Sequence, residues 1–233
     1  MKFNKELVFN YAFDYGDGRV KRFTIRLDGQ TLNYLPDQEV RVTEWARLDN
    51  HQCPNCPLRK EQHPFCPIAQ NIVQVLDSFE NDYSYEEITV TVETPIRSYV
   101  AKTSLQRGLS AMMGIYMVSS GCPIMARLKP MVRYHLPFAT IEETVYRSAS
   151  TYLLGQYFKM KKGLQPDWEL KELIRIYQNV QQVNAAMADR LRSSQAKDAN
   201  INALIVLDVF AKELPQNIER SLENLSYLFE DQF

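Results

Sequence analysis

The sequence lacks the short motifs that mark the common catalytic folds. It has no Walker-type or G-x-G-x-x-G glycine pattern, no G-x-S-x-G, no H-E-x-x-H and no obvious pairing of a nucleophile with a base. These absences argue against the usual nucleotide-binding and hydrolase sites. They leave an enzymatic role open but favour a protein without one.

The chain also has little net charge and no secretory signal. Its formal charge at pH 7 is −1, so no overall field favours nucleic acid or an anionic membrane. The first six residues lack the apolar segment of a signal peptide. Residues 108–126 are uncharged, but they contain three glycines, three serines and a proline, which favours a buried helix over a membrane span. We therefore expect a cytoplasmic protein.

The first part of the chain, residues 1–98, predicts antiparallel β structure. Apolar and polar residues alternate over 9–15 and 22–27, on either side of a Gly-Asp-Gly turn at 16–18, which is typical of a hairpin. Further short strands are indicated at 31–34, at Val40 and Val42, and at the β-branched run 88–92. We expect a sheet of about four strands.

Helical periodicity dominates residues 99–233. Thr140 and Glu143 have the spacing of a capping box, and Gly163 is expected to end the helix that follows. Apolar residues have helical spacing at about 108–119, from Leu170 to Leu191, from Asp198 to Phe210 and beyond Pro215. In the first region, residues 68–79 also have helical spacing. The fold class is therefore predicted to be α+β, with the sheet first and a mainly helical half second.

All four cysteines are followed by proline. Three of them, Cys53, Cys56 and Cys66, lie in an aperiodic knuckle at 49–67 with the spacing C-x2-C-x9-C, and Cys122 lies far down the chain. Thiolates from one loop and one distant segment are typical of a metal site. A metal held there would clamp the two regions into one integrated domain and would contribute directly to folding stability.

Two kinds of metal centre suit four thiolates. Zinc takes four thiolates, or three with a histidine, and a [4Fe–4S] cluster also takes four. The ferredoxin spacing is absent, so zinc is favoured. The histidines that could replace a cysteine are His51, His63 and His135.

Other interpretations of the cysteines stay open. Cys122 follows an apolar helix and could be an inert buried side chain. The string C-P-N-C at 53–56 resembles the redox motif of glutaredoxin-like proteins, but it does not follow an apolar strand as that motif requires.

No acidic residue lies between Glu93 and Glu142, although this stretch is rich in basic ones. The basic residues could offset the negative charge of a metal–thiolate centre, or they could bind a nucleotide, a phosphate or an acidic partner. We favour a simpler interpretation, a solvated basic face paired with acids elsewhere. The candidate anion-binding residues are Arg127, Lys129 and Arg133, with His135 beside them.

Four short strings carry a resemblance to a known family. They are H-Q-C-P-N-C-P-L at 51–58, F-C-P-I-A at 65–69, S-G-C-P at 120–123 and R-Y-H-L-P-F-A-T at 133–140. The chain resembles an uncharacterised bacterial protein family over a region that runs from the hairpin into the helical half. The resemblance implies a bacterial cytosolic protein and adds no mechanism.

The sequence therefore predicts a metal-binding protein, with zinc favoured, in a structural, binding or regulatory role. The alternatives are a [4Fe–4S] redox or sensor protein and an enzyme that acts on an anionic small molecule. The long C-terminal helices also predict a homodimer.

Overall fold

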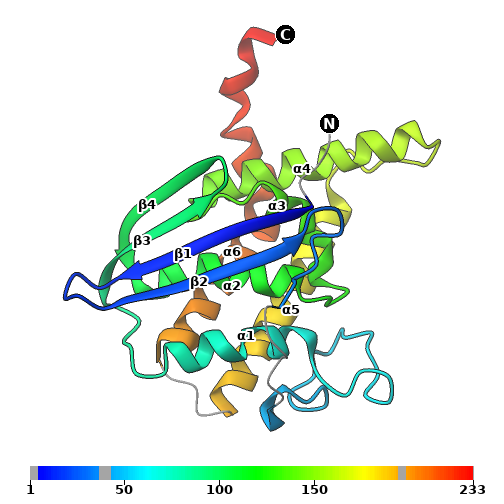
Figure 1. Ribbon diagram of the computed structural model, residues 1–233. Helices are drawn as coiled ribbons and strands as arrows, with labels where there is room; N and C mark the ends of the chain where they lie inside the picture. Colours follow the sequence, from blue (N-terminus) through cyan, green and yellow to red (C-terminus); the bar gives the residue numbers. More distant parts are fainter. Residues whose placement is uncertain (1–4, 37–42, 194–197, 233) are drawn as a thin grey trace.

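A computed structural model of the chain describes residues 5–36, 43–193 and 198–232 (Figure 1). The predicted strand at Val40 and Val42 lies outside the described residues. In Figure 1 the sheet lies across the front, and the helices of the second half lie behind it. The α+β class, with the sheet first and the helices second, is confirmed.

One antiparallel sheet contains four strands in the order β2-β1-β3-β4. The expected number of strands is confirmed, but their identity differs in part. Residues 31–34 contribute only a single bridge, between Leu27 and Tyr34, and the fourth strand is a segment that the sequence did not indicate. The strands are β1 (Glu6–Asp14), β2 (Val20–Asp28), β3 (Glu87–Thr94) and β4 (Arg97–Ser104).

The α-helices follow the sheet in sequence, except for α1, which lies between the two hairpins of the sheet. None of the helices in the described part of the chain is long and apolar enough to cross a bilayer. The helices are α1 (Pro67–Ser78), α2 (Leu105–Ser119), α3 (Lys129–Arg133), α4 (Ile141–Lys161), α5 (Lys171–Ser193) and α6 (Asp198–Glu223), and the 3-10 helices are η1 (Glu44–Ala46), η2 (Met125–Leu128) and η3 (Ser226–Gln232).

Local signals set the helix ends. Helix α4 begins at the predicted capping box, in which the Glu143 amide donates to the Thr140 hydroxyl at 3.1 Å and the Thr140 amide donates to the Glu143 carboxylate at 2.7 Å. Helix α6, in contrast, continues through position 215, where the sequence predicted a break. Ile218 and Leu225, beyond that position, are buried, and this packing offsets the hydrogen bond that proline cannot donate.

The core lies between one face of the sheet and the helices behind it. Alternate residues of β1, namely Phe9, Tyr11 and Phe13, are buried there. Helix α2 lies close against the sheet at Gly108, where an added Cβ would lie 2.8 Å from a methyl group of Val90 and 3.1 Å from the Phe13 ring. Only glycine allows this approach without a shift of the neighbouring atoms.

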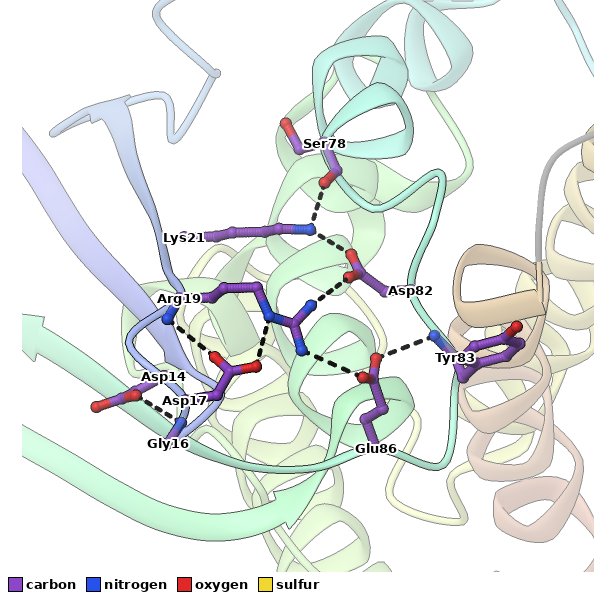
Figure 2. Close-up of polar contacts among 9 residues, drawn as sticks. All are labelled: Asp14, Gly16, Asp17, Arg19, Lys21, Ser78, Asp82, Tyr83 and Glu86. Atoms are coloured by element: carbon purple, nitrogen blue, oxygen red, sulfur yellow. Dashed lines mark hydrogen bonds and ion pairs between the residues drawn. The ribbon is translucent and has the colours of Figure 1, made fainter.

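The turn of the first hairpin is tied to the segment that follows α1 (Figure 2). Lys21 forms a salt bridge with Asp82 and donates to the carbonyl of Ser78 at 2.7 Å. Arg19 lies 3.6 Å from Asp82 and 3.5 Å from Glu86. The Asp82 side chain is only 4% exposed, so these cations compensate a buried carboxylate.

Candidate metal centre

The knuckle begins and ends as two segments that run side by side. The Leu48 amide donates to the Pro64 carbonyl at 2.9 Å, and the Cys66 amide donates to the Ala46 carbonyl at 2.8 Å. Cys66 is the residue before α1, with Pro67 in the first turn. Its buried thiol is therefore fixed at the point where the knuckle joins the helix.

Cys53 and Cys56 share a tight turn. The Cys56 amide donates to the Cys53 carbonyl at 3.0 Å, and Pro54 occupies the second position of the turn, where proline is favoured. The turn is attached to the helical half because Asn55 bonds to Asn179 on α5.

Cys122 follows the end of α2. Helix α2 ends at Ser119, close to where the sequence predicted, and Gly121 has a φ of 93°, a left-handed conformation that glycine adopts without strain. The chain then turns into η2, since the Ala126 amide donates to the Cys122 carbonyl at 2.9 Å. The Cys122 side chain is 7% exposed.

All four thiols are free, and they act on one another electrostatically. The pKa of Cys53 is raised to about 12, chiefly by burial and also by charges on Cys66, Cys122 and Cys56. Burial also raises the pKa of Cys122, with smaller contributions from Cys66 and Cys56. The structure thus brings the distant cysteine into the neighbourhood of the other three.

The spacing of these thiols is not that of an assembled metal site. In residues 5–36, 43–193 and 198–232, no group of three or more His, Cys, Asp or Glu side chains is positioned to hold a metal ion. The donor chemistry suits zinc or an iron–sulfur cluster, and the sulfurs would have to move together to bind either.

A buried cation that the sequence analysis missed lies beside the thiols. Arg190 on α5 is 1% exposed, and its guanidinium donates to the carbonyls of Trp45, Arg47 and Leu48. Burial lowers the pKa of Arg190, while charges on Cys66, Cys53 and Cys56 act in the opposite direction. The sequence could have indicated that Arg190 is buried, because it lies three residues after Met187 on the apolar stripe of α5.

The three histidines are in different surroundings. His51 and His63 are exposed on the knuckle. His135 lies against the sheet, where its Nε2 is 2.8 Å from the Tyr11 hydroxyl and its ring packs edge-on to Phe9 with 5.5 Å between centroids. Burial lowers the pKa of His135 to about 3, with a smaller effect of Arg147.

The candidate anion-binding residues differ in their contacts. Lys129 donates to the Thr31 carbonyl at 2.7 Å and also bonds to Asn33, and Arg127 is exposed. Arg133 instead lines a hollow of about 630 Å³ that Arg97, Arg147 and His135 also line, together with the acidic Glu6. Arg97 and Arg147 were not among the sequence candidates for this role.

The structure is that of an α+β protein with four free thiols that act on one another electrostatically, and three of them, Cys53, Cys56 and Cys66, also act on a buried arginine. Residues 9–230 match the family described as Domain of unknown function (DUF6901), and the chain belongs to that family. No curated protein and no solved structure matches the chain.

Proposed function

We propose that Cys53, Cys56, Cys66 and Cys122 bind one metal centre, with zinc favoured, and that this centre clamps the knuckle to the helical half. The role is structural or regulatory. The single observation that carries the proposal is the electrostatic coupling of four free thiols from both halves of the chain, three of which also act on the buried Arg190.

The buried positive charge of Arg190 favours an anionic metal–thiolate centre beside it. Its guanidinium bonds only to carbonyl oxygens among the described residues, and its buried Nε has no hydrogen-bond partner. Asp49 is the weakest of its electrostatic neighbours. A buried cation without a counter-ion is costly, and a zinc ion with four thiolates carries a net charge of about −2. The centre would supply the missing charge.

Binding requires the side chains to move. The zinc–sulfur distance in such sites is about 2.3 Å, so rotation of the cysteine side chains and a shift of the Cys53–Cys56 turn would bring the four sulfurs to one ion. Two thiols belong to residues with hydrogen-bonded backbone, Cys66 at the start of α1 and Cys122 in the turn before η2. The thiols that would move are the two in the half-buried Cys53–Cys56 turn.

Metal analysis of the purified protein tests the proposal. We expect about one zinc per chain after aerobic purification, and loss of that zinc in Cys122→Ser. Met117→Leu, a nearly volume-conserving change at a buried position of α2, is the control for a general disturbance of the core. We expect this control to keep its zinc.

The same experiment separates the alternatives. His51→Gln and His63→Gln should keep their zinc, since four thiolates suffice. A brown protein after anaerobic purification, with iron and sulfide in place of zinc, would support the [4Fe–4S] redox or sensor role instead. Protein without metal under both atmospheres would overturn the proposal.

A second candidate function is the binding of an anionic small molecule. The hollow lined by Arg97, Arg133 and Arg147 favours it, because three arginines line one space with a single acidic residue among the described lining. A thermal-shift screen with phosphate and nucleotides tests it. Stabilisation that Arg97→Ala removes would support this candidate, and no response would exclude it.

A homodimer remains a proposal. Its support is the exposure of large apolar side chains near the C-terminus, which stands away from the body in Figure 1: Tyr227, Leu228 and Phe229. Light scattering of the eluted protein would give twice the chain mass for a dimer and the chain mass for a monomer.

A further inference from the structure

The far end of α4 carries an exposed surface that is both apolar and basic. Residues 154–164, which we call the basic segment, extend away from the body of the molecule in Figure 1. Every residue from 157 to 165 is exposed, and no acidic residue lies between positions 143 and 167. The large apolar side chains exposed on this segment are Leu154, Tyr157, Phe158, Met160 and Leu164, and its charged residues are Lys159, Lys161 and Lys162.

The exposed apolar face of α4 is opposite its buried face. Leu154, Tyr157 and Phe158 are three and four positions apart, so they lie on one side of the helix. The rings of Tyr157 and Phe158 contact each other edge-on, with 5.6 Å between centroids. Gln156 lies on the other side, where it is buried and accepts a hydrogen bond from the Asp167 amide at 2.9 Å. The rest of the chain therefore holds this face in place but leaves it open to solvent.

The C-terminal segment η3 has the opposite charge and a similar apolar character. We call it the acidic segment, because every charged residue after position 220 is acidic. It also stands away from the body in Figure 1. Its exposed apolar side chains are Tyr227, Leu228 and Phe229, and its charged residues are Glu230 and Asp231.

Within one chain the two segments do not neutralise each other. In the part of the chain that the structure describes, none of Lys159, Lys161 and Lys162 forms an ion pair with an acidic side chain. A hollow of about 310 Å³ lies between the middle of α4 and the end of the chain, and its lining includes Leu153 and Phe229. Each segment therefore presents apolar side chains and unpaired charge of one sign to a partner.

We propose that the basic segment of one chain docks on the acidic segment of a second copy, and that the reverse contact forms at the same time around a twofold axis. The inference rests on the proposed homodimer and identifies the two surfaces that form it. Each contact covers apolar side chains on both segments and brings lysines next to carboxylates. Apolar burial supplies most of the affinity, and the charges set the pairing.

Opposite charge favours this pairing over contacts between identical segments. Two basic segments placed face to face would bring their lysines together, and two acidic segments would bring their carboxylates together. Like charges that meet in an interface are costly, whereas the unlike segments attract each other. The charge pattern therefore determines which surface of the second copy each segment contacts.

Charge reversal in the full chain tests the pairing. One variant carries Lys159→Glu, Lys161→Glu and Lys162→Glu, and the other carries Glu230→Lys and Asp231→Lys. We expect the dimer dissociation constant of each variant to rise at least about a hundredfold over that of the unmodified chain, because like charges then meet in both contacts. Sedimentation equilibrium gives these constants.

Mixing the two variants provides the decisive measurement. In a mixed pair the two reversed segments meet each other, and the two unchanged segments meet each other, so both contacts again unite opposite charges. We expect a heterodimer with about the affinity of the unmodified dimer. The matched control, with Lys159→Arg, Lys161→Arg and Lys162→Arg, keeps the charge and should keep the dimer. Circular dichroism and thermal melting establish that each variant is folded.

Several results would overturn the pairing. A dimer that neither variant weakens would exclude these two segments but would leave the proposed homodimer standing, whereas a chain that stays monomeric at millimolar concentration would exclude both. Weakened variants that do not associate on mixing would show that the segments do not meet each other. A monomeric chain that floats with vesicles containing phosphatidylserine would assign the basic segment to a lipid surface instead.

Discussion

The side-chain amide of Asn55 donates hydrogen bonds to both the main-chain oxygen and the side-chain oxygen of Asn179, at 3.1 and 3.0 Å. Asn55 lies between Cys53 and Cys56, and Asn179 lies on α5. The Cys53–Cys56 turn of the knuckle is thus attached to the helical half by these hydrogen bonds. Asn179 is held in place in turn, because its amide donates to the Arg175 carbonyl at 2.9 Å.

Asn179→Ala tests this attachment without changing the knuckle itself. It leaves the Asn55 amide with only the main-chain oxygen as acceptor, so we expect the free energy of unfolding to fall by about 1 kcal/mol. If the knuckle binds zinc, the zinc dissociation constant should also rise. Gln178→Ala, at the exposed neighbouring position of α5, is the control and should change neither quantity. Urea titration and zinc competition with a chelator provide the measurements.

Arg190→Met tests the buried cation. The change keeps much of the side-chain volume but leaves the carbonyls of Trp45, Arg47 and Leu48 without their donor, so we expect a loss of about 3 kcal/mol in the free energy of unfolding. If Arg190 balances a metal–thiolate centre, zinc affinity should fall by at least about tenfold as well.

The matched control for this variant lies two residues further along α5. Arg192 forms a surface pair with Asp189, with side chains 52% and 57% exposed, so Arg192→Met should cost less than about 0.5 kcal/mol. A destabilised Arg190→Met protein that binds zinc as tightly as the unmodified chain would show that Arg190 supports the knuckle alone.

Features with a local signal were predictable from the sequence. The first hairpin follows from alternation around its glycine turn, and α4 begins at the capping box of Thr140 and Glu143. The cysteine spacing likewise indicated which residues to examine. These signals are local because each depends on residues a few positions apart.

Features set by distant packing were not predictable. Strand β4 lies at the edge of the sheet and is mostly exposed, so its residues, such as Arg97 and Lys102, show no alternation of apolar and polar types. Arg190 and Asn184 each interrupt an apolar stripe of α5. An apolar stripe shows that a residue is buried, but it does not show what the residue contacts. For Arg190 the contacts come from a chain segment more than a hundred residues away.

His135 should make stability depend on pH. Burial lowers the pKa of its imidazole from 6.5 to about 3 in the folded protein. Between these values the unfolded chain binds a proton that the folded chain does not, so stability is lost as the pH falls, by up to about 1.4 kcal/mol per pH unit. Tyr11 and Arg147, its polar and charged neighbours, do not supply a compensating negative charge near neutral pH.

His135→Gln isolates this contribution, since glutamine does not titrate and can still bond to Tyr11. From pH 7 to pH 5 we expect the unmodified protein to lose about 2 kcal/mol more than the variant. Urea unfolding at several pH values gives the difference, in which the other titrating groups cancel. Parallel curves for the two proteins would contradict the assignment of a buried neutral imidazole.

Asp82→Asn tests the connection between the first hairpin and the segment after α1. The change removes the negative charge that pairs with Lys21 and Arg19 and keeps only an amide oxygen as acceptor, but these cations are 28% and 51% exposed and can be hydrated, so we expect a loss of about 1–3 kcal/mol rather than more. Glu87→Gln is the control, because its pair with Lys102 spans 3.9 Å between side chains that are 80% and 77% exposed. Thermal unfolding should separate the two variants clearly.

Gly108→Ala and Gly155→Ala should have opposite effects although both glycines lie within helices. A methyl group at position 108 would press on Val90 and Phe13, and because both are packed in the core we expect a loss of about 1–3 kcal/mol. At position 155 a Cβ would meet nothing within 4 Å, so alanine should stabilise α4 by up to about 1 kcal/mol through its helix propensity. Equal shifts of the unfolding midpoint would show that α2 does not approach the sheet as closely as this packing requires, whereas opposite shifts would place the contact between α2 and β3 at Gly108.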